Sequence, residues 1–346
     1  MKKQKIFITV TAILLLTVIF LKPAFFADGI KRGLSYCSQI IIPSLFPFMV
    51  ASSLAAYGDV PHFAKKLCKK VSHILFRLPS EAITAVFLGI IGGYPSGAKA
   101  VNSLLSSGKI SESQAKKLVL FCINSGAGFA VNAVGSAMLN SRECGKFIFF
   151  SGCAASIILG IAASLLSEKA SPVLTLTHTD TPFSKAVVDS VTSSACNMLS
   201  ICGFVCIFSA ISEIVISFNI NETLKTVIVC LLEVTSGCSF AVTRVSLPVL
   251  CAVISFGGIC VHLQIFSLCK DFRPDIGLFY LFRILHAVLS ALICGSILHF
   301  HPVPSEVFLS FSKNAAPFSF SAPSAISLLF LSALLILDLD TEKKIC

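Results

Sequence analysis

Two charged side chains interrupt apolar stretches of the chain at points where glycine or proline also breaks the pattern. Lys99 follows Gly93-Tyr94-Pro95-Ser96-Gly97, and Glu233 precedes Val234-Thr235-Ser236-Gly237. A charge at the centre of a bilayer costs about 2.5 to 3.5 kcal/mol on insertion scales, which favours a position beside a polar cavity or an opposite charge. We expect Lys99 to meet an anionic group and Glu233 to bind a proton, a cation or a donor group of a solute. The alternatives are a buried Lys99–Glu233 ion pair and a Lys99 side chain that reaches the cytoplasmic interface.

Helix ends at these breaks are themselves candidate binding groups. An N-terminus has unpaired N–H groups and partial positive charge that suit a carboxylate or phosphate, and the residues just after Gly97 offer such a terminus. Four further polar side chains within apolar spans serve either as hydrogen bonds between helices or as ligands. The candidate binding residues are therefore Gly93, Tyr94, Pro95, Ser96, Gly97, Lys99, Asn124, Ser125, Glu233, Ser236, Gly237, His262 and Gln264.

The sequence contains no recognisable catalytic or metal-binding motif. It lacks GxSxG, HExxH and Walker patterns, and no carboxylate dyad or Cys/His cluster has the spacing of an active site or a zinc site. The 15 Cys residues are scattered without a CxxC pair, and most lie inside apolar runs as small packing residues. We therefore expect neither an enzyme nor a bound cofactor, and the sequence does not identify a coupling cation or proton.

The composition of the 346 residues is that of an integral membrane protein. Hydrophobic residues make up 55% and charged residues 13%, with a mean hydropathy of +0.89. Soluble domains carry about 25% charged residues, so half that density does not cover a water-facing surface. The net charge of +10 comes from Lys and Arg in short loops between apolar runs. The positive-inside rule explains that pattern, and nucleic-acid binding is not expected.

Apolar runs of about 20 residues predict membrane-spanning helices. We predict an all-α polytopic membrane protein with about eight transmembrane helices and both termini in the cytoplasm. Bulky residues follow the first run without a small-x-small cleavage site, so we interpret this run as a retained anchor rather than a cleaved signal peptide. The predicted spans are 6–21, 34–57, 117–139, 147–166, 198–218, 247–268, 276–298 and 324–337.

Two apolar segments, 82–107 and 225–244, are each too short on either side of their break to cross a bilayer. Basic residues flank both ends of the first segment, which predicts a re-entrant hairpin that enters from the cytoplasm. The count of crossings places the second hairpin on the opposite side. Together they predict an inverted repeat with a binding site where the two hairpin tips meet.

These elements predict the organisation of the chain. Two repeats form the centre, and a polar, proline-containing stretch marks the boundary between them. The predicted parts are 1–33, an N-terminal anchor and interfacial segment; 34–167, the first repeat; 168–197, a linker and amphipathic helix; 198–298, the second repeat; and 299–346, an outer loop, a last transmembrane helix and a cytoplasmic tail.

Four short strings together resemble the nucleoside-recognition (Gate) domain family and, more narrowly, the YlbJ-type sporulation integral membrane proteins of endospore-forming bacteria. The resemblance covers roughly residues 30 to 300. Ala127 departs from the pattern, because proline is expected after the third string. The strings are Pro43-Ser44-x-x-Pro47-Phe48, Gly93-Tyr94-Pro95-Ser96-Gly97-Ala98-Lys99, Asn124-Ser125-Gly126 and Phe256-Gly257-Gly258-x-x-Val261-His262-x-Gln264.

The resemblance implies a fold similar to the core of concentrative nucleoside transporters, with paired re-entrant hairpins. It also implies a role in spore cortex formation and passage of dipicolinic acid across the outer forespore membrane. Our main hypothesis is a transporter or permease for a small anionic or nucleoside-like solute, embedded in the lipid bilayer, with a homo-oligomer left open. The alternatives are a non-transporting structural membrane factor of sporulation, a nucleoside or ion gate subunit, and a membrane-embedded enzyme.

Overall fold

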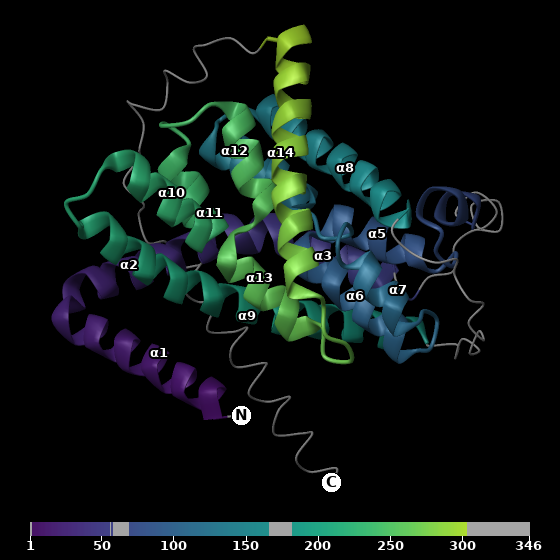
Figure 1. Ribbon diagram of the computed structural model, residues 1–346, viewed down its shortest axis with the longest axis horizontal. Coiled ribbons are helices and arrows are strands. Elements are labelled where there is room, and N and C mark those ends of the chain that lie inside the picture. The colour runs from purple at the N-terminus through teal and green to yellow at the C-terminus, as the bar shows by residue number, and fades with distance from the viewer. Residues whose placement is uncertain (1, 56, 58–68, 166–181, 303–346) are drawn as a thin grey trace.

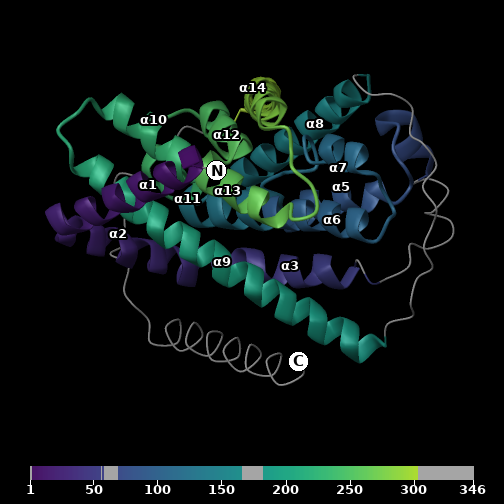
Figure 2. The same ribbon diagram turned by 60° about the horizontal axis from the view of Figure 1, so that its bottom comes forward.

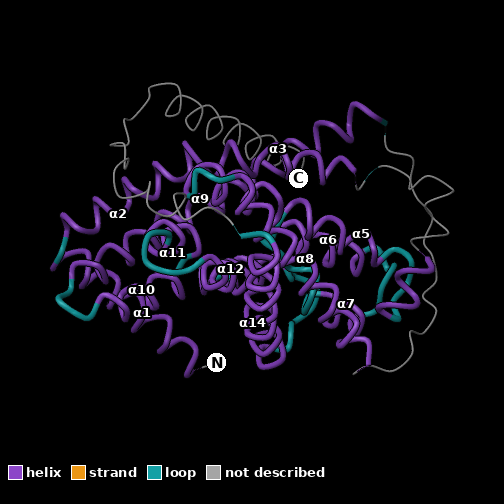
Figure 3. Tube along the Cα trace, turned by 90° about the horizontal axis from the view of Figure 1, so that it is seen from above, coloured by secondary structure: helices purple, strands orange, loops and turns teal. Residues whose placement is uncertain are grey.

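The computed structural model describes residues 2–55, 57, 69–165 and 182–302. Within these ranges the chain forms helices joined by loops and contains no strand, which confirms the predicted all-helical class (Figure 3). The predicted last span, 324–337, the cytoplasmic tail and residues 168–181 of the linker 168–197 lie outside the described residues.

In the described part of the chain, five helices are long and apolar enough to cross a membrane. About eight were predicted over the whole chain. Two of the predicted spans, 6–21 and 117–139, do not form a single apolar helix of spanning length in the structure. The run 6–21 belongs to α1, Lys2–Leu21, whose apolar part, Ile8–Leu21, is shorter than a full span. The run 117–139 is not one continuous helix. The five helices are Pro23–Ala51, Arg142–Leu165, Phe183–Ser217, Leu247–Leu268 and Ile276–Phe300.

A helix–break–helix pair occupies the first predicted hairpin. Helix α5, Ala82–Gly92, is followed by α6, Tyr94–Ser106, and Gly93 separates them with a φ of 85° that favours glycine. Gly89 and Gly97 face one another across the pair, since a Cβ on Gly89 would lie 3.4 Å from the Gly97 Cα. The two arms therefore pack tightly and antiparallel. Their depth in a membrane stays a prediction.

The second predicted hairpin has the same form. Helix α10, Glu222–Leu232, is followed by α11, Val234–Ala241, and Glu233 lies between them in an extended conformation. A Cβ on Gly237 would lie 2.7 Å from the Cα of Cys230, so these two arms also pack backbone against backbone.

Each hairpin is followed by a broken helix. The first consists of α7, Glu112–Leu118, and the π-helix η3, Gly128–Met138, with residues 119–125 unwound between them. A capping box formed by Ser111 and Gln114, residues of the local pattern Ser-x-x-Gln, begins α7. The second broken helix consists of α12, Leu247–Phe256, and α13, Gly258–Leu268, which meet at Gly257.

Helix α9, Phe183–Ser217, is a single helix of 35 residues. The sequence predicted an amphipathic interfacial helix, 183–197, followed by a separate span from residue 198. The structure joins them because no glycine or proline interrupts the helix at their junction. At 1.5 Å per residue, α9 is longer than the roughly 30 Å hydrocarbon core, so it tilts or extends beyond it.

The long helix formed by α2 (Pro23–Tyr36), η1 (Cys37–Ile41) and α3 (Ile42–Ala55) runs antiparallel to α9 (Figure 2). Glycines allow the close approach, since a Cβ on Gly29 would lie 2.4 Å from the Ala210 Cα.

Helix α14, Ile276–Phe300, crosses the other side of the molecule, where it packs on α12 and on α8, Arg142–Leu165 (Figure 1). The short π-helix η2, Ser72–Phe76, lies before the first hairpin and packs against α8.

Candidate functional site

The breaks of the two hairpins line one small cavity. Gly93 and Tyr94 come from the first break, and Glu233 comes from the second. Ser125 of the unwound segment and Gln264 of α13 add two polar groups. The volume is about 40 Å³, which compares with about 30 Å³ for one molecule of liquid water. The remaining wall is mostly apolar and includes Ile41, Leu45, Met49, Phe129, Ile201, Val205 and Val261.

Glu233 caps helix α11. Its side chain is buried, one carboxylate oxygen accepts the N–H of Thr235 at 2.7 Å, and the other accepts the N–H of Ser236 at 2.6 Å. These N–H groups have no partner inside the helix, and the negative charge also suits the positive end of the helix. Glu233 and Lys99 form no ion pair, so the alternative of a buried Lys99–Glu233 pair is wrong.

The N-terminus of α6 lacks a comparable cap. Gly93 occupies its N-cap position, where no side chain accepts a hydrogen bond, and the hydroxyl of Ser96 bonds back to the carbonyl of Gly92 at 3.1 Å. Beside this terminus, the Ser125 side chain is only 4% exposed and its hydroxyl has no hydrogen-bond partner among the described residues. The cavity wall at the first break thus has no carboxylate and includes the hydroxyl of Ser125, whereas two N–H donors of the second break bind Glu233.

The tip of each hairpin packs against the broken helix that follows it in the chain. A Cβ on Gly126 would lie 2.7 Å from the Cα of Gly93, and a Cβ on Gly258 would lie 3.4 Å from the nitrogen of Glu233. Both glycines have a positive φ, which favours glycine on conformational grounds as well.

Other candidate residues near the first break lie outside the cavity wall. Lys99 is half-buried on α6, one helical turn beyond the cavity-lining Pro95. Gly97 packs against the carbonyl of Cys122. Asn124 accepts the N–H of Ser125 at 2.8 Å through its side-chain oxygen, and its amide nitrogen lies 3.7 Å from the sulfur of Cys153 on α8.

The remaining candidates near the second break also have structural partners. The hydroxyl of Ser236 hydrogen-bonds that of Ser209 on α9 at 2.8 Å, and Gly237 packs on α10. His262 is fully buried, with Nε2 2.8 Å from the carbonyl oxygen of Phe256. The ring of His262 is enclosed by the rings of Phe256, Phe279 and Tyr280, away from the cavity wall.

Arg283 is a central residue that the sequence interpretation left out of the site. Near the start of a predicted span, an arginine is typical of a positive-inside anchor. In the structure it is fully buried on α14 and donates to the carbonyls of Ile123 at 2.8 Å and Leu120 at 3.1 Å. The only signal in the sequence is the presence of a charge within an apolar run.

Carbonyls at the end of α12 are likewise paired with side chains from elsewhere. The hydroxyl of Tyr94 donates to Ile254, and Nδ1 of His286 lies 3.1 Å from the oxygen of Ser255. His286, on α14, was also left out of the predicted site. The tip of the first hairpin is therefore joined to the second broken helix, and α14 is joined to both broken helices.

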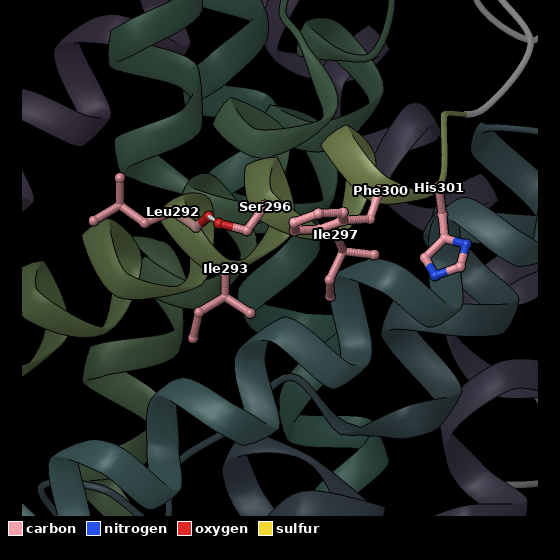
Figure 4. A pocket seen from close by; sticks show the side chains of 6 residues that line it. All are labelled: Leu292, Ile293, Ser296, Ile297, Phe300 and His301. Carbon is pink, nitrogen blue, oxygen red and sulfur yellow. Dashed lines mark hydrogen bonds between the residues drawn. The ribbon is translucent and has the colours of Figure 1, made fainter.

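A second hollow follows the end of α14, and all of its lining residues belong to this helix or directly follow it (Figure 4). It contains no buried charged group and adjoins the point where the described residues end, so it supports no binding role. Its lining residues are Leu292, Ile293, Ser296, Ile297, Phe300 and His301.

Comparisons with known proteins give one curated relative. No protein-family model and no solved structure matches the chain. The sporulation integral membrane protein YlbJ of Bacillus subtilis (strain 168) is 24% identical over 218 residues, which cover 57% of this chain and 53% of that protein. The chain thus spans about half the length of its relative. The similarity supports the YlbJ-type resemblance, and the resemblance to the Gate domain family stays a prediction.

Proposed function

We propose that this protein is a sporulation membrane permease that carries a small anionic solute, dipicolinic acid, across the outer forespore membrane. The observation that carries the proposal is the meeting of two hairpin breaks, about 140 residues apart in the sequence, at one small cavity whose mostly apolar wall includes the polar groups of Glu233, Ser125 and Gln264. Breaks at corresponding positions of two repeats are typical of transporter binding sites. The similarity to a sporulation integral membrane protein supports the biological setting.

The difference between the two helix N-termini supports an anionic solute. At α11 a carboxylate, that of Glu233, already accepts the free N–H groups. At α6 the corresponding position is Gly93, which has no side chain. A carboxylate of the solute would lie at α6 where Glu233 lies at α11, and it would accept the N–H of Ser96 and the hydroxyl of Ser125, since Pro95, which corresponds to Thr235, has no N–H. Lys99, one turn further along α6, would add a positive charge on the way to the site.

The small cavity indicates how passage would occur. A volume of about 40 Å³ does not hold an aromatic dicarboxylate, since pockets for such ligands measure about 300 Å³ or more. The described arrangement therefore corresponds to a closed form. Solute entry requires one hairpin tip to move away from the other, first on one side of the membrane and then on the other.

The test is flux of dipicolinate into liposomes that contain the purified protein and trap terbium, which luminesces when dipicolinate binds it. We expect Lys99→Gln and Glu233→Gln to lower the uptake rate at least about tenfold, because the first removes the positive charge that attracts the anion and the second removes the charged acceptor that holds the N-terminus of α11 at the cavity. Lys225→Gln and Glu222→Gln, which alter an ion pair on α10 away from the cavity wall, with Glu222 exposed and Lys225 partly buried, are the matched controls and should transport normally. Wild-type rates in correctly inserted Lys99 and Glu233 variants would refute the site.

A non-transporting structural factor of sporulation is the second candidate. The tight cavity and the hydrogen bonds that join the two repeats favour it. This candidate predicts no flux of dipicolinate or nucleosides above that of empty liposomes, even for wild-type protein whose correct orientation has been verified. Uptake of uridine in place of dipicolinate would instead favour the nucleoside gate.

A further inference from the structure

We propose that Arg283 is a built-in cation that holds the unwound segment 119–125 in place and thereby positions Ser125 in the cavity wall. The proposal rests on the proposed function for its biological meaning, because the cavity is the proposed solute site. Arg283 is then a positioning residue, which acts on the solute through the backbone that carries Ser125.

The hydrogen bonds of Arg283 reach the part of the segment that leads to the cavity. Nη1 donates to the carbonyl of Ile123, two residues before Ser125, at 2.8 Å, and Nη2 donates to Leu120 at 3.1 Å. Arg283 stands 160 residues after Ile123 in the chain. A helix from the second repeat therefore fixes the backbone of the first.

The guanidinium has backbone oxygens in place of a carboxylate partner. No carboxylate among the described residues forms an ion pair with Arg283, and its Nε–H has no hydrogen-bond partner there. A buried charge of this kind is costly unless strong hydrogen bonds compensate it. Carbonyls left free by unwinding have partial negative charge, and in broken-helix transporters such groups coordinate a bound cation. Here the guanidinium of Arg283 takes the place that a bound cation takes beside such carbonyls.

The break in the second broken helix differs in a way that supports this role. It is short, because Gly257 alone separates α12 from α13. The carbonyls at the end of α12 pair with the side chains of Tyr94 and His286, which need no charge to form these hydrogen bonds. In the first broken helix, the N–H groups of residues 119–122 still bond to carbonyls of residues 115, 117 and 118, whereas those of residues 123–125 bond to no backbone carbonyl among the described residues. A longer unwound stretch loses more backbone bonds, so charge-assisted bonds, which are about twice as strong as neutral ones, are needed there.

Hydrogen–deuterium exchange of the amides in 119–125, measured by mass spectrometry on the full chain in nanodiscs, tests the proposal without any solute. We expect Arg283→Gly and Arg283→Gln to exchange about tenfold to hundredfold faster in this segment, as loss of bonds to a charged group predicts. Millimolar guanidinium should restore protection in the glycine variant, and equal sodium chloride should not. Arg283→Lys should retain more protection than Arg283→Gln. Arg273→Gly, an exposed site just before α14, is the matched control.

The proposal is overturned if Arg283→Gln exchanges like the wild type, because a neutral side chain would then suffice. It is also overturned if guanidinium fails to protect a folded Arg283→Gly variant. If the glycine variant does not fold, the comparison of the Gln and Lys variants decides. Faster exchange in these variants together with a lack of flux in wild-type protein would refute the proposed function alone.

Discussion

Gly93 and Gly126 touch through their backbones, so that a Cβ on Gly126 would lie 2.7 Å from both the nitrogen and the Cα of Gly93. This contact seats the tip of the first hairpin on the unwound end of the following helix. Each of the two glycines is next in the chain to a residue that lines the cavity: Gly93 precedes Tyr94, and Gly126 follows Ser125. The position of the site thus depends on glycine at both places.

Gly126→Ala should lower the free energy of unfolding by more than about 2 kcal/mol, because a side chain at positive φ adds strain to a backbone clash. Gly203→Ala is the control, since a Cβ there meets nothing within 4 Å and alanine suits a helix. Thermal unfolding in detergent measures both. Equal stability of the two variants would contradict the described contact.

Tyr94→Phe removes the hydroxyl that donates to the carbonyl of Ile254 and leaves that buried carbonyl unpaired. We expect a loss of about 1 to 3 kcal/mol in stability, the usual cost of such a group. Tyr280→Phe is a suitable control, because its hydroxyl has no partner among the described residues while its ring also packs on a neighbour. A Tyr94→Phe variant as stable as Tyr280→Phe would show that the bond is not formed.

Glu233→Ala should destabilise the protein by about 1.5 to 3 kcal/mol, since it removes a charged acceptor from two buried N–H groups. Asn221→Ala, which removes the exposed cap of α10, should cost about 1 kcal/mol. Formate should restore part of the melting temperature of the Glu233 variant and none of that of the Asn221 variant. Without a specific effect of formate, the cap would not be the reason for the loss.

The contact between α2 and α9 contains both a close-packed glycine and an ion pair, so the contributions of packing and of charge to stability can be measured separately. Gly33→Leu should cost more than about 2 kcal/mol, because a Cβ at Gly33 would already lie 2.7 Å from the Cα of Cys206. Arg32→Ala breaks an ion pair with Glu213 in which the arginine is 46% exposed, and should cost less than about 1 kcal/mol. Chemical unfolding of both variants gives the comparison, and the reverse order would refute the packing argument.

The sequence indicated the two hairpin breaks because their causes are local. Glycine at residue 93 followed by proline at residue 95 stops one helix and starts another, and a lone acidic residue before Thr235-Ser236-Gly237 marks the second break. The role of Glu233 as the N-cap of α11 was not predicted. The capping box before α7 is local in the same way. Such features need only a few neighbouring residues, and the structure places them where they were expected.

The unwound segment 119–125 could not be read from the sequence, because its causes are distant. Leu118-Val119-Leu120-Phe121 has the apolar character of a membrane helix. What stabilises its unwound form is a guanidinium on a helix far along the chain, and that pairing depends on the tertiary fold. The same reason explains why Arg283 was interpreted as an interface anchor. His262 was placed in the site because its polar type says nothing about which side of α13 faces the cavity.

The antiparallel pairing of α9 with α2, η1 and α3 has a mechanical consequence. Because α2 and α3 both pack on α9 and glycines bring the backbones of α2 and α9 into contact, these helices form a rigid unit that resists sliding of one helix along another. Under the proposed function, the movement would then fall to the short helices on either side of Gly93 and of Glu233. Any passage of solute would then depend on movement of these two short helix pairs relative to the packed helices α2, α3 and α9.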